Sequence, residues 1–162
     1  MSVTTLIVRT SAVALLALAG ACGNSASRAA QIAQTSEETS KDFDDYEVHI
    51  NAIRTDQLPA EVARSYAIQR SKNQVLLNVT VLSKQAGTRR KAVEAKIAVA
   101  AHNLNGQVKD VELRRVNESD AIYYIGEVSI SGNEILVFDV KVTPANDTRV
   151  LELKFKREFF TD

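Results

Sequence analysis

The 162-residue chain contains one cysteine, no tryptophan, two histidines, two prolines and six glycines. A single cysteine excludes an internal disulfide, and the absence of tryptophan argues against the core of an antibody-type domain. A zinc site needs three or four converging ligands, so His49 and His102 alone do not predict one. The few prolines and glycines exclude a low-complexity protein.

Strong net charge and the familiar catalytic motifs are also missing. Twenty basic and twenty acidic residues balance, so no overall field directs the chain to nucleic acid or to an anionic membrane. The sequence has no His-Glu-x-x-His, no Gly-x-Ser-x-Gly and no phosphate-binding glycine loop. We therefore predict no catalytic residue, no metal ligand and no cofactor.

What is present begins with an export signal. A short apolar run follows Arg9 and ends in small residues at positions 19–21, immediately before Cys22. The run is too short for a transmembrane helix and suits the core of a signal peptide. Residues 19–22 also resemble the bacterial lipoprotein box, although Ala19 stands where that box usually has leucine. We expect residues 1–21 to be a signal peptide.

Cys22 is the predicted lipidation site, and lipid on this residue would leave no thiol for catalysis, metal or a disulfide. The alternative is an incidental cysteine beside a site cut by the ordinary signal peptidase. Because Gly23 is not the aspartate that retains lipoproteins at the inner membrane, the resemblance implies anchoring to the outer membrane. Residues 22–43 are rich in small and polar residues, and we predict a flexible tether there.

The most strand-like segment covers residues 120–130. Ile122, Tyr124 and Val128 fall on one face at period two, with Gly126 as a gap in that row. Tyr123 lies on the opposite face. One of the two tyrosines is expected in the core, and the other is available to line a ligand groove. Strand signals on both sides place this segment inside a sheet.

The remaining alternating segments lie at residues 46–53, 74–83, 93–101, 108–116, 135–142 and 149–160. Asn105-Gly106 predicts a tight two-residue hairpin, and a phase change near Asp110 predicts a bulge. Pro59 predicts a short helix or turn near residues 59–64. We predict an all-β fold, an immunoglobulin-like antiparallel β-sandwich of seven to eight strands over residues 44–162.

Several separated motifs support this domain. They are Arg70-Ser71-Lys72-Asn73, Leu76-Leu77-Asn78-Val79, Asn103-Leu104 with Gly106-Gln107, the stretch from Asp120 to Ile125, and Phe159-Phe160-Thr161-Asp162. Together they resemble the secreted proteobacterial domain-of-unknown-function family numbered 4426, over about residues 44–162. The resemblance implies export and the domain boundaries, and it implies no activity.

Three functions fit these observations. We favour a non-catalytic periplasmic module that binds another envelope protein, by surface complementarity or strand addition, with a lipid anchor on Cys22 and no nucleic-acid partner. The alternative is a carrier for a small apolar ligand, which a deep apolar cavity between the sheets would support. The third is an unrecognised hydrolase, which a buried carboxylate paired with His49 or His102 in a cleft would support.

Overall fold

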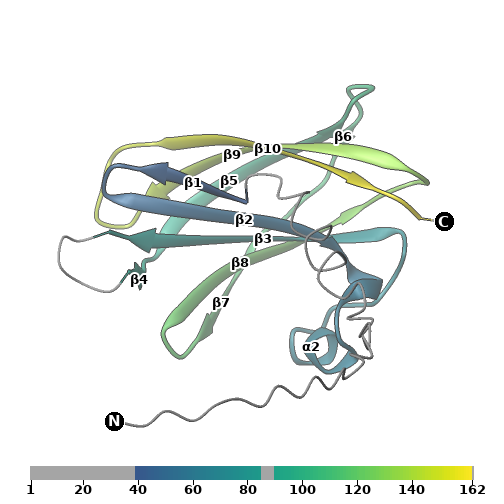
Figure 1. The fold of residues 1–162 in the computed structure, drawn as a ribbon, viewed down its shortest axis with the longest axis horizontal. Coiled ribbons are helices and arrows are strands. Elements are labelled where there is room, and N and C mark those ends of the chain that lie inside the picture. Colours follow the sequence, from purple (N-terminus) through teal and green to yellow (C-terminus); the bar gives the residue numbers. More distant parts are fainter. Residues whose placement is uncertain (1–38, 85–89, 162) are drawn as a thin grey trace, which may run out of the picture. The chain divides into compact units, whose positions relative to one another are not determined.

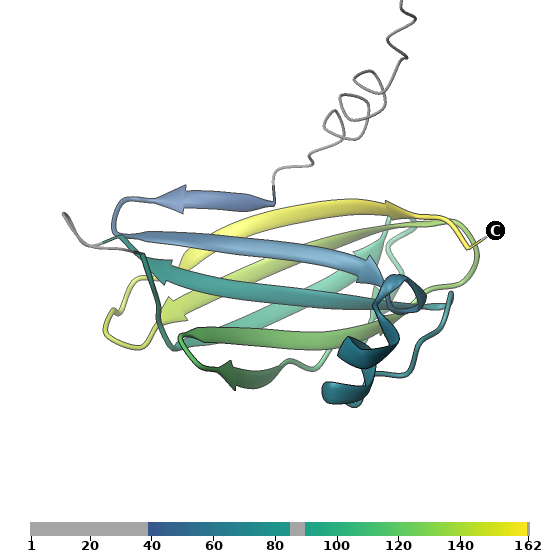
Figure 2. The ribbon, with the colours of Figure 1, turned by 60° about the horizontal axis from the view of Figure 1, so that its bottom comes forward.

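We describe a computed structural model of the chain over residues 39–84 and 90–161, which form two antiparallel β-sheets (Figures 1 and 2). The larger sheet has the order β1-β2-β3-β8-β7, with β4 also paired to β3, and the smaller sheet has the order β10-β9-β5-β6. The strands of the larger sheet are β1 (Ser40–Phe43), β2 (Tyr46–Arg54), β3 (Gln74–Ser83), β4 (Lys91–Ala92), β7 (Arg114–Glu118) and β8 (Ala121–Ser129). Those of the smaller sheet are β5 (Ala95–Asn103), β6 (Val108–Lys109), β9 (Glu134–Pro144) and β10 (Leu151–Phe159).

The topology is that of an immunoglobulin domain. Seven of the described strands have five or more residues, and in chain order they are β2, β3, β5, β7, β8, β9 and β10. Named A to G, they give the sheets ABED and CFG of the constant-type arrangement. The predicted antiparallel sandwich is therefore confirmed, and β1, β4 and β6 are short additions to its edges.

The core lies between the two sheets and follows the predicted alternation. Apolar side chains at every second position of β2, β3, β9 and β10 point inward and are almost fully buried. Within the smaller sheet, the rings of the cross-strand partners Phe138 and Phe155 stack in this core with their centroids 6.0 Å apart. Tyr124 is the core tyrosine, at 7 % exposure, and its hydroxyl accepts a hydrogen bond from the Ala95 N–H at 2.7 Å.

A second apolar cluster covers part of the outer face of the larger sheet. It is built by the segment between β2 and β3, which holds the 3-10 turn η1 (Thr55–Gln57) and helix α2 (Ala60–Ser65). Ala63 and Ile68 are buried there with Leu76 of β3 and Ile125 of β8. The short helix or turn predicted near residues 59–64 is confirmed, and it is a helix. In the described part of the chain no helix is long and apolar enough to span a bilayer.

The sheet begins earlier in the chain than predicted. Strand β1 pairs with β2 from Ser40↔His49 to Phe43↔Tyr46, so the last four residues assigned to the tether belong to the sheet. The alternating charges of this segment are typical of a linker, but they also suit an edge strand that is wetted on one side. The other predicted tether residues up to position 38, including Cys22, lie outside the described residues.

The hairpin at Asn105-Gly106 is one residue longer than predicted. The Asn103 N–H donates to the Gln107 carbonyl at 3.0 Å, and this pair encloses a three-residue loop. Gly106 closes the loop with a φ of +77°, which is the left-handed conformation that a three-residue hairpin requires. The glycine was therefore a correct turn signal, but the two-residue register was wrong.

The phase change near Asp110 has a different cause from the predicted bulge. Strand β6 belongs to the smaller sheet and β7 to the larger one, so residues 110–113 cross from one sheet to the other. A chain that changes sheets must present its apolar side chains to the same core from the opposite layer. The shift in the apolar pattern marks this crossing.

Candidate functional site

The two sides of strand β8 differ in how completely they are paired. Ile130, the residue after β8, donates its N–H to the carbonyl of Asn73, the residue before β3, at 2.9 Å. This bond continues the register of β8 with β3, so Ile130 directs its peptide groups towards β3. Peptide groups along an antiparallel strand alternate in direction. The even-numbered residues of β8 therefore face β3, and Glu127 and Ser129 face the other side, where β7 lies.

Strand β7 covers only the first half of that side. Its register with β8 runs from Glu118↔Ala121 to Arg114↔Ile125 and stops there. From Gly126 to Ser129 the β7 side of β8 has no paired strand within the described residues. We call this segment the open edge of β8. It presents the N–H and C=O groups of Glu127 and Ser129, two residues whose side chains are exposed.

Gly126 explains why β7 does not continue. A Cβ atom at this position would lie 2.7 Å from the Glu112 carbonyl oxygen, 2.9 Å from Leu113 Cδ2 and 3.1 Å from Val111 Cγ2. The crossing segment therefore passes directly against Gly126 and leaves the sheet at that point. The gap that Gly126 makes in the apolar row of β8 is the space through which the chain changes sheets.

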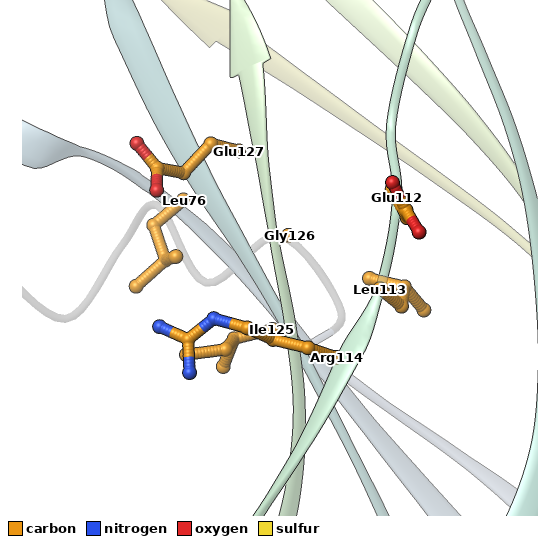
Figure 3. A pocket seen from close by; sticks show the side chains of 7 residues that line it. All are labelled: Leu76, Glu112, Leu113, Arg114, Ile125, Gly126 and Glu127. Atoms are coloured by element: carbon orange, nitrogen blue, oxygen red, sulfur yellow. The ribbon is translucent and has the colours of Figure 1, made fainter. Parts of the chain in front are cut away.

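A cavity of about 410 Å³ adjoins the open edge (Figure 3). It is lined by Leu76, Glu112, Leu113, Arg114, Ile125, Gly126 and Glu127. In Figure 3 the side chain of Arg114 extends across Ile125 towards Leu76, and Glu127 lies on the same side of β8. The Arg114 guanidinium donates to the Tyr66 carbonyl, so it is held in place, whereas Glu112 and Glu127 are exposed carboxylates.

Basic side chains cover the free carbonyls along the β10 edge of the smaller sheet. Among the described strands, β10 pairs only with β9. The carbonyls of Glu152 in β10 and of Phe160, the residue after this strand, point away from β9. The Lys41 ammonium donates to the Glu152 carbonyl at 3.0 Å, and the Arg54 guanidinium donates to the Phe160 carbonyl. Basic side chains over free carbonyls are a common protection against unwanted strand pairing. The open edge of β8 has no such guard within the described residues.

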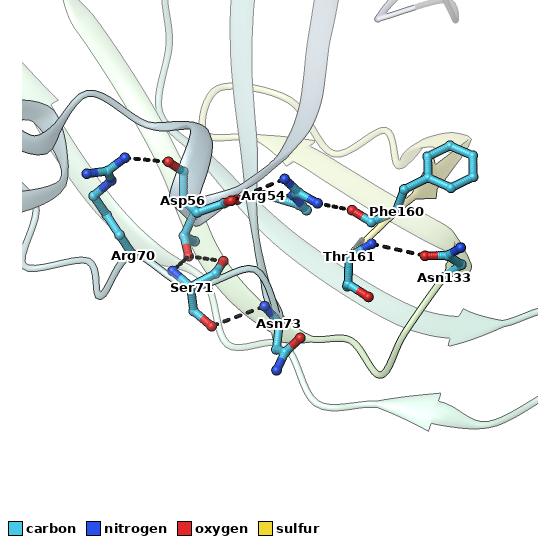
Figure 4. A network of polar contacts seen from close by, with 9 residues as sticks. Arg54, Asp56, Arg70, Ser71, Asn73, Asn133, Phe160 and Thr161 are labelled. Carbon is cyan, nitrogen blue, oxygen red and sulfur yellow. Dashed lines mark hydrogen bonds and ion pairs between the residues drawn. The ribbon is translucent and has the colours of Figure 1, made fainter.

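The motif at positions 70–73 and the C-terminal motif belong to the scaffold (Figure 4). Thr55 is fully buried and exchanges hydrogen bonds with the Ser71 backbone, at 2.9 Å and 3.1 Å. The Arg70 guanidinium donates to the Asp56 carbonyl at 2.5 Å, and Arg54 forms a bidentate pair with the Asp56 carboxylate at 3.0 Å and 3.1 Å. These contacts hold the segment that carries α2, and Arg54 also joins it to the C-terminal strand.

A second polar cluster fixes the hairpin after β5. Asn103 is 5 % exposed, and its amide donates to Glu134 Oε1 at 2.7 Å. Lys109 Nζ lies 2.9 Å from the same carboxylate, which also accepts the Ser131 N–H at 3.3 Å. Burial alone would raise the pKa of Glu134, but the hydrogen bonds from Lys109, Asn103 and Ser131 outweigh it, so this pKa lies below its ordinary value. The cluster therefore stabilises the hairpin after β5.

Each of the two histidines lies beside one carboxylate. His49 Nε2 lies 3.2 Å from Glu47 Oε1, and Glu47 is 8 % exposed, so a buried carboxylate beside a histidine is present. However, the Arg90 guanidinium lies 2.5 Å from the other oxygen of Glu47 and neutralises it. His102 Nδ1 lies 3.8 Å from the half-exposed Asp139 carboxylate. Within residues 39–84 and 90–161, no three histidine, cysteine, aspartate or glutamate side chains come together as metal ligands.

Comparison with known proteins places this domain in a family. Residues 40–162 match the domain of unknown function DUF4426. The crystal structure of a DUF4426 family protein from Pseudomonas aeruginosa PAO1 is 34 % identical, with a TM-score of 0.62, and covers 76 % of this chain and 94 % of that one. None of the curated proteins is significantly similar to the chain.

More distant structures share only the fold. FetP of uropathogenic Escherichia coli strain F11 is 8 % identical, with a TM-score of 0.54, over 75 % of this chain and 92 % of its own. A copper-bound variant of the same FetP is 9 % identical, with a TM-score of 0.53, over 74 % and 93 %. The family match and the Pseudomonas relative give the stronger result: this chain belongs to the DUF4426 family of domains of unknown function.

Proposed function

We propose that the protein is exported to the periplasm and that its domain is a non-catalytic binding module for an extended segment of another envelope protein. The apolar leader before Cys22 supports export. The open edge of β8 carries the proposal for binding, because a partner strand can complete the hydrogen bonds that β7 leaves unmade. Strand addition obtains its affinity from the main chain and its specificity from pockets for alternate side chains.

The cavity beside the open edge defines what such a segment would contact. Leu76 and Ile125 offer an apolar floor, and the exposed carboxylates of Glu112 and Glu127 lie beside it. A segment that combines apolar and basic side chains would complement this surface. The inner faces of both sheets are filled by buried side chains, and this favours a binding module over a carrier with a pocket between the sheets.

Photocrosslinking in living cells tests this proposal. We expect a photoreactive residue at position 127 or 112 to give one dominant protein adduct, the same from both positions, because both side chains border the open edge. The matched control is position 141 on the smaller sheet, where the lysine side chain is 63 % exposed. Adducts would be identified by mass spectrometry. The same adduct from all three positions, or none from 112 and 127 in a folded protein, would contradict the proposal.

A backbone variant separates strand addition from other kinds of contact. Proline at position 129 removes an N–H that faces the open edge and leaves the hydrogen bonds to β3 in place. We expect Ser129→Pro to abolish the shared adduct, whereas Ser129→Ala should keep it. Circular dichroism would establish that both variants are folded. An undiminished adduct from folded Ser129→Pro would show that the partner does not pair with β8.

The membrane anchor is a separate part of the proposal. A lipid on Cys22 would attach the domain to the outer membrane, and the small residues before the cysteine and the glycine after it support this. We expect labelled palmitate to enter the wild-type protein and not Cys22→Ser, and the wild type to fractionate with the outer membrane. Equal labelling of the two proteins would overturn the anchor and favour cleavage by the ordinary signal peptidase.

A further inference from the structure

The other side of β8 is also incompletely paired, at its beginning. Strand β3 pairs with β8 as far as Val79↔Tyr124, and β4 then takes the place of β8, with Leu82↔Ala92 in register. The Val81 carbonyl accepts the Val93 N–H at 3.0 Å. In the continued register of β3 and β8, Val81 would instead have paired with Ile122. Strands β4 and β8 therefore form a fork beside β3.

Ile122 lies at the fork with its peptide groups directed into it. As an even-numbered residue of β8 it faces the β3 side, and the β3 residue opposite is already bonded to the β4 segment. A groove of about 870 Å³ opens here on the outer face of the larger sheet, which is within the range of pockets for small ligands. Its lining residues come from β3, from β4 and the residue before it, and from the end of β7, the β7–β8 turn and the start of β8.

The groove has an apolar and aromatic floor between walls of opposite charge. Leu82 and Tyr123 line it from the sheet, so the second tyrosine of the Tyr-Tyr pair does border a groove. Lys91 on β4 and Asp120 on the β7–β8 turn contribute one exposed charge each, and neither has an ion-pair partner among the described residues.

The two other charged lining residues are already engaged. Arg90 pairs with Glu47 at 2.5 Å. Glu118 accepts a hydrogen bond from the Tyr66 hydroxyl. This hydrogen bond, together with burial, raises the pKa of Tyr66 to about 12. Among the described residues, the groove therefore offers one cation and one anion without an ion-pair partner, and one unpaired peptide unit, to a ligand.

We propose that this groove binds a short extended peptide with free termini. The ligand's backbone would exchange hydrogen bonds with Ile122, its ammonium group would pair with Asp120, its carboxylate would pair with Lys91, and an apolar side chain would pack on Tyr123. This site lies on the side of β8 opposite the open edge and does not depend on the function proposed above. A peptide suits it better than a sugar or a lipid headgroup because only a peptide matches both the charges and the backbone unit.

Titration of the ¹⁵N-labelled domain with the tripeptide Ala-Leu-Ala, followed by NMR, tests the proposal. We expect saturable shifts of the Ile122 and Tyr123 amides. The same tripeptide with an acetylated N-terminus and an amidated C-terminus should bind roughly tenfold more weakly, since it lacks both terminal charges. Equal binding of the blocked and free peptides would overturn the assignment of the charged walls. Shifts confined to Gly126–Ser129 would give the peptide to the open edge instead.

Charge variants add a second readout on the folded protein. Lys91→Asp should weaken the binding of the free tripeptide. The double variant Lys91→Asp with Asp120→Lys should recover binding, because the peptide can then bind in the reverse direction. Lys141→Asp on the smaller sheet is the matched control and should change nothing. If the double variant does not recover binding of the tripeptide, the proposed pairing of its two termini with positions 91 and 120 is wrong. Shifts with N-acetylglucosamine or phosphoethanolamine but not with the tripeptide would overturn the peptide assignment.

Discussion

Replacing Gly126 with valine should lower the free energy of unfolding by about 3 kcal/mol, because the new side chain has no space. Its Cβ would lie 2.7 Å from the Glu112 carbonyl oxygen, which is backbone and cannot rotate away, and 2.9 Å from Leu113 Cδ2. Relief would require the crossing segment to move out of the core. Urea unfolding followed by circular dichroism measures the effect.

Ser129→Val is the matched control for this variant. Ser129 lies on the same strand, but its side chain is exposed, so the same substitution should change stability by about 0.5 kcal/mol or less. Equal effects at the two positions would show that the crossing segment does not pack against β8. The comparison therefore tests the contact that ends β7 and creates the open edge.

The sequence predicted the parts of the fold that depend on local alternation. Leu136, Phe138 and Val140 were expected to face inward, and all three are at most 1 % exposed. The same holds for the core tyrosine and the short helix after Pro59. In each case the side-chain period or a single residue's backbone preference decides the structure, and neighbours in sequence carry that information.

The candidate site was not predictable in the same way. The open edge exists because β7 pairs with β8 only as far as Arg114↔Ile125, and that register depends on where a distant segment crosses between the sheets. Two signals were present in the sequence, the gap at Gly126 and the phase change near Asp110. Each had a local explanation, a missing side chain and a bulge, and only the fold shows that they mark the same crossing. The fork at Ile122 likewise depends on strand β4, whose two residues carry no alternation to read.

The second large effect is expected at Lys109, whose ammonium contacts a carboxylate in a nearly buried pair. The side chains of Lys109 and Glu134 are 9 % and 10 % exposed. Lys109→Met should lower the free energy of unfolding by about 2–4 kcal/mol. The nearly buried Glu134 carboxylate then loses its charged partner and keeps the hydrogen bonds from the Asn103 amide and the Ser131 N–H. The matched control is Lys154→Met, which breaks the exposed pair with Asp139 and should cost at most about 1 kcal/mol.

A double variant tests whether Lys109→Met loses stability because the Glu134 charge is unpaired or because packing is lost. In Lys109→Met with Glu134→Gln the buried carboxylate is gone, and the glutamine keeps an oxygen that accepts from Asn103. We expect this protein to be more stable than Lys109→Met alone, since leaving one partner of a buried pair costs more than neutralising both. If the double variant is less stable by the sum of the two single effects, the pair is not coupled.

The pH dependence of these variants gives an independent test. In the wild type the folded-state pKa of Glu134 lies below its ordinary value of 4.5, so its contribution to stability is complete above that value and is lost as the pH falls through the lowered folded pKa. Without Lys109 the largest lowering contribution is gone, so the pKa of Glu134 should lie higher than in the wild type. The difference in stability between wild type and Lys109→Met should therefore be largest at neutral pH and shrink as the carboxylate becomes protonated. A difference that stays constant from neutral pH to well below the ordinary value would mean that Lys109 stabilises the turn by packing its aliphatic chain and not by its charge.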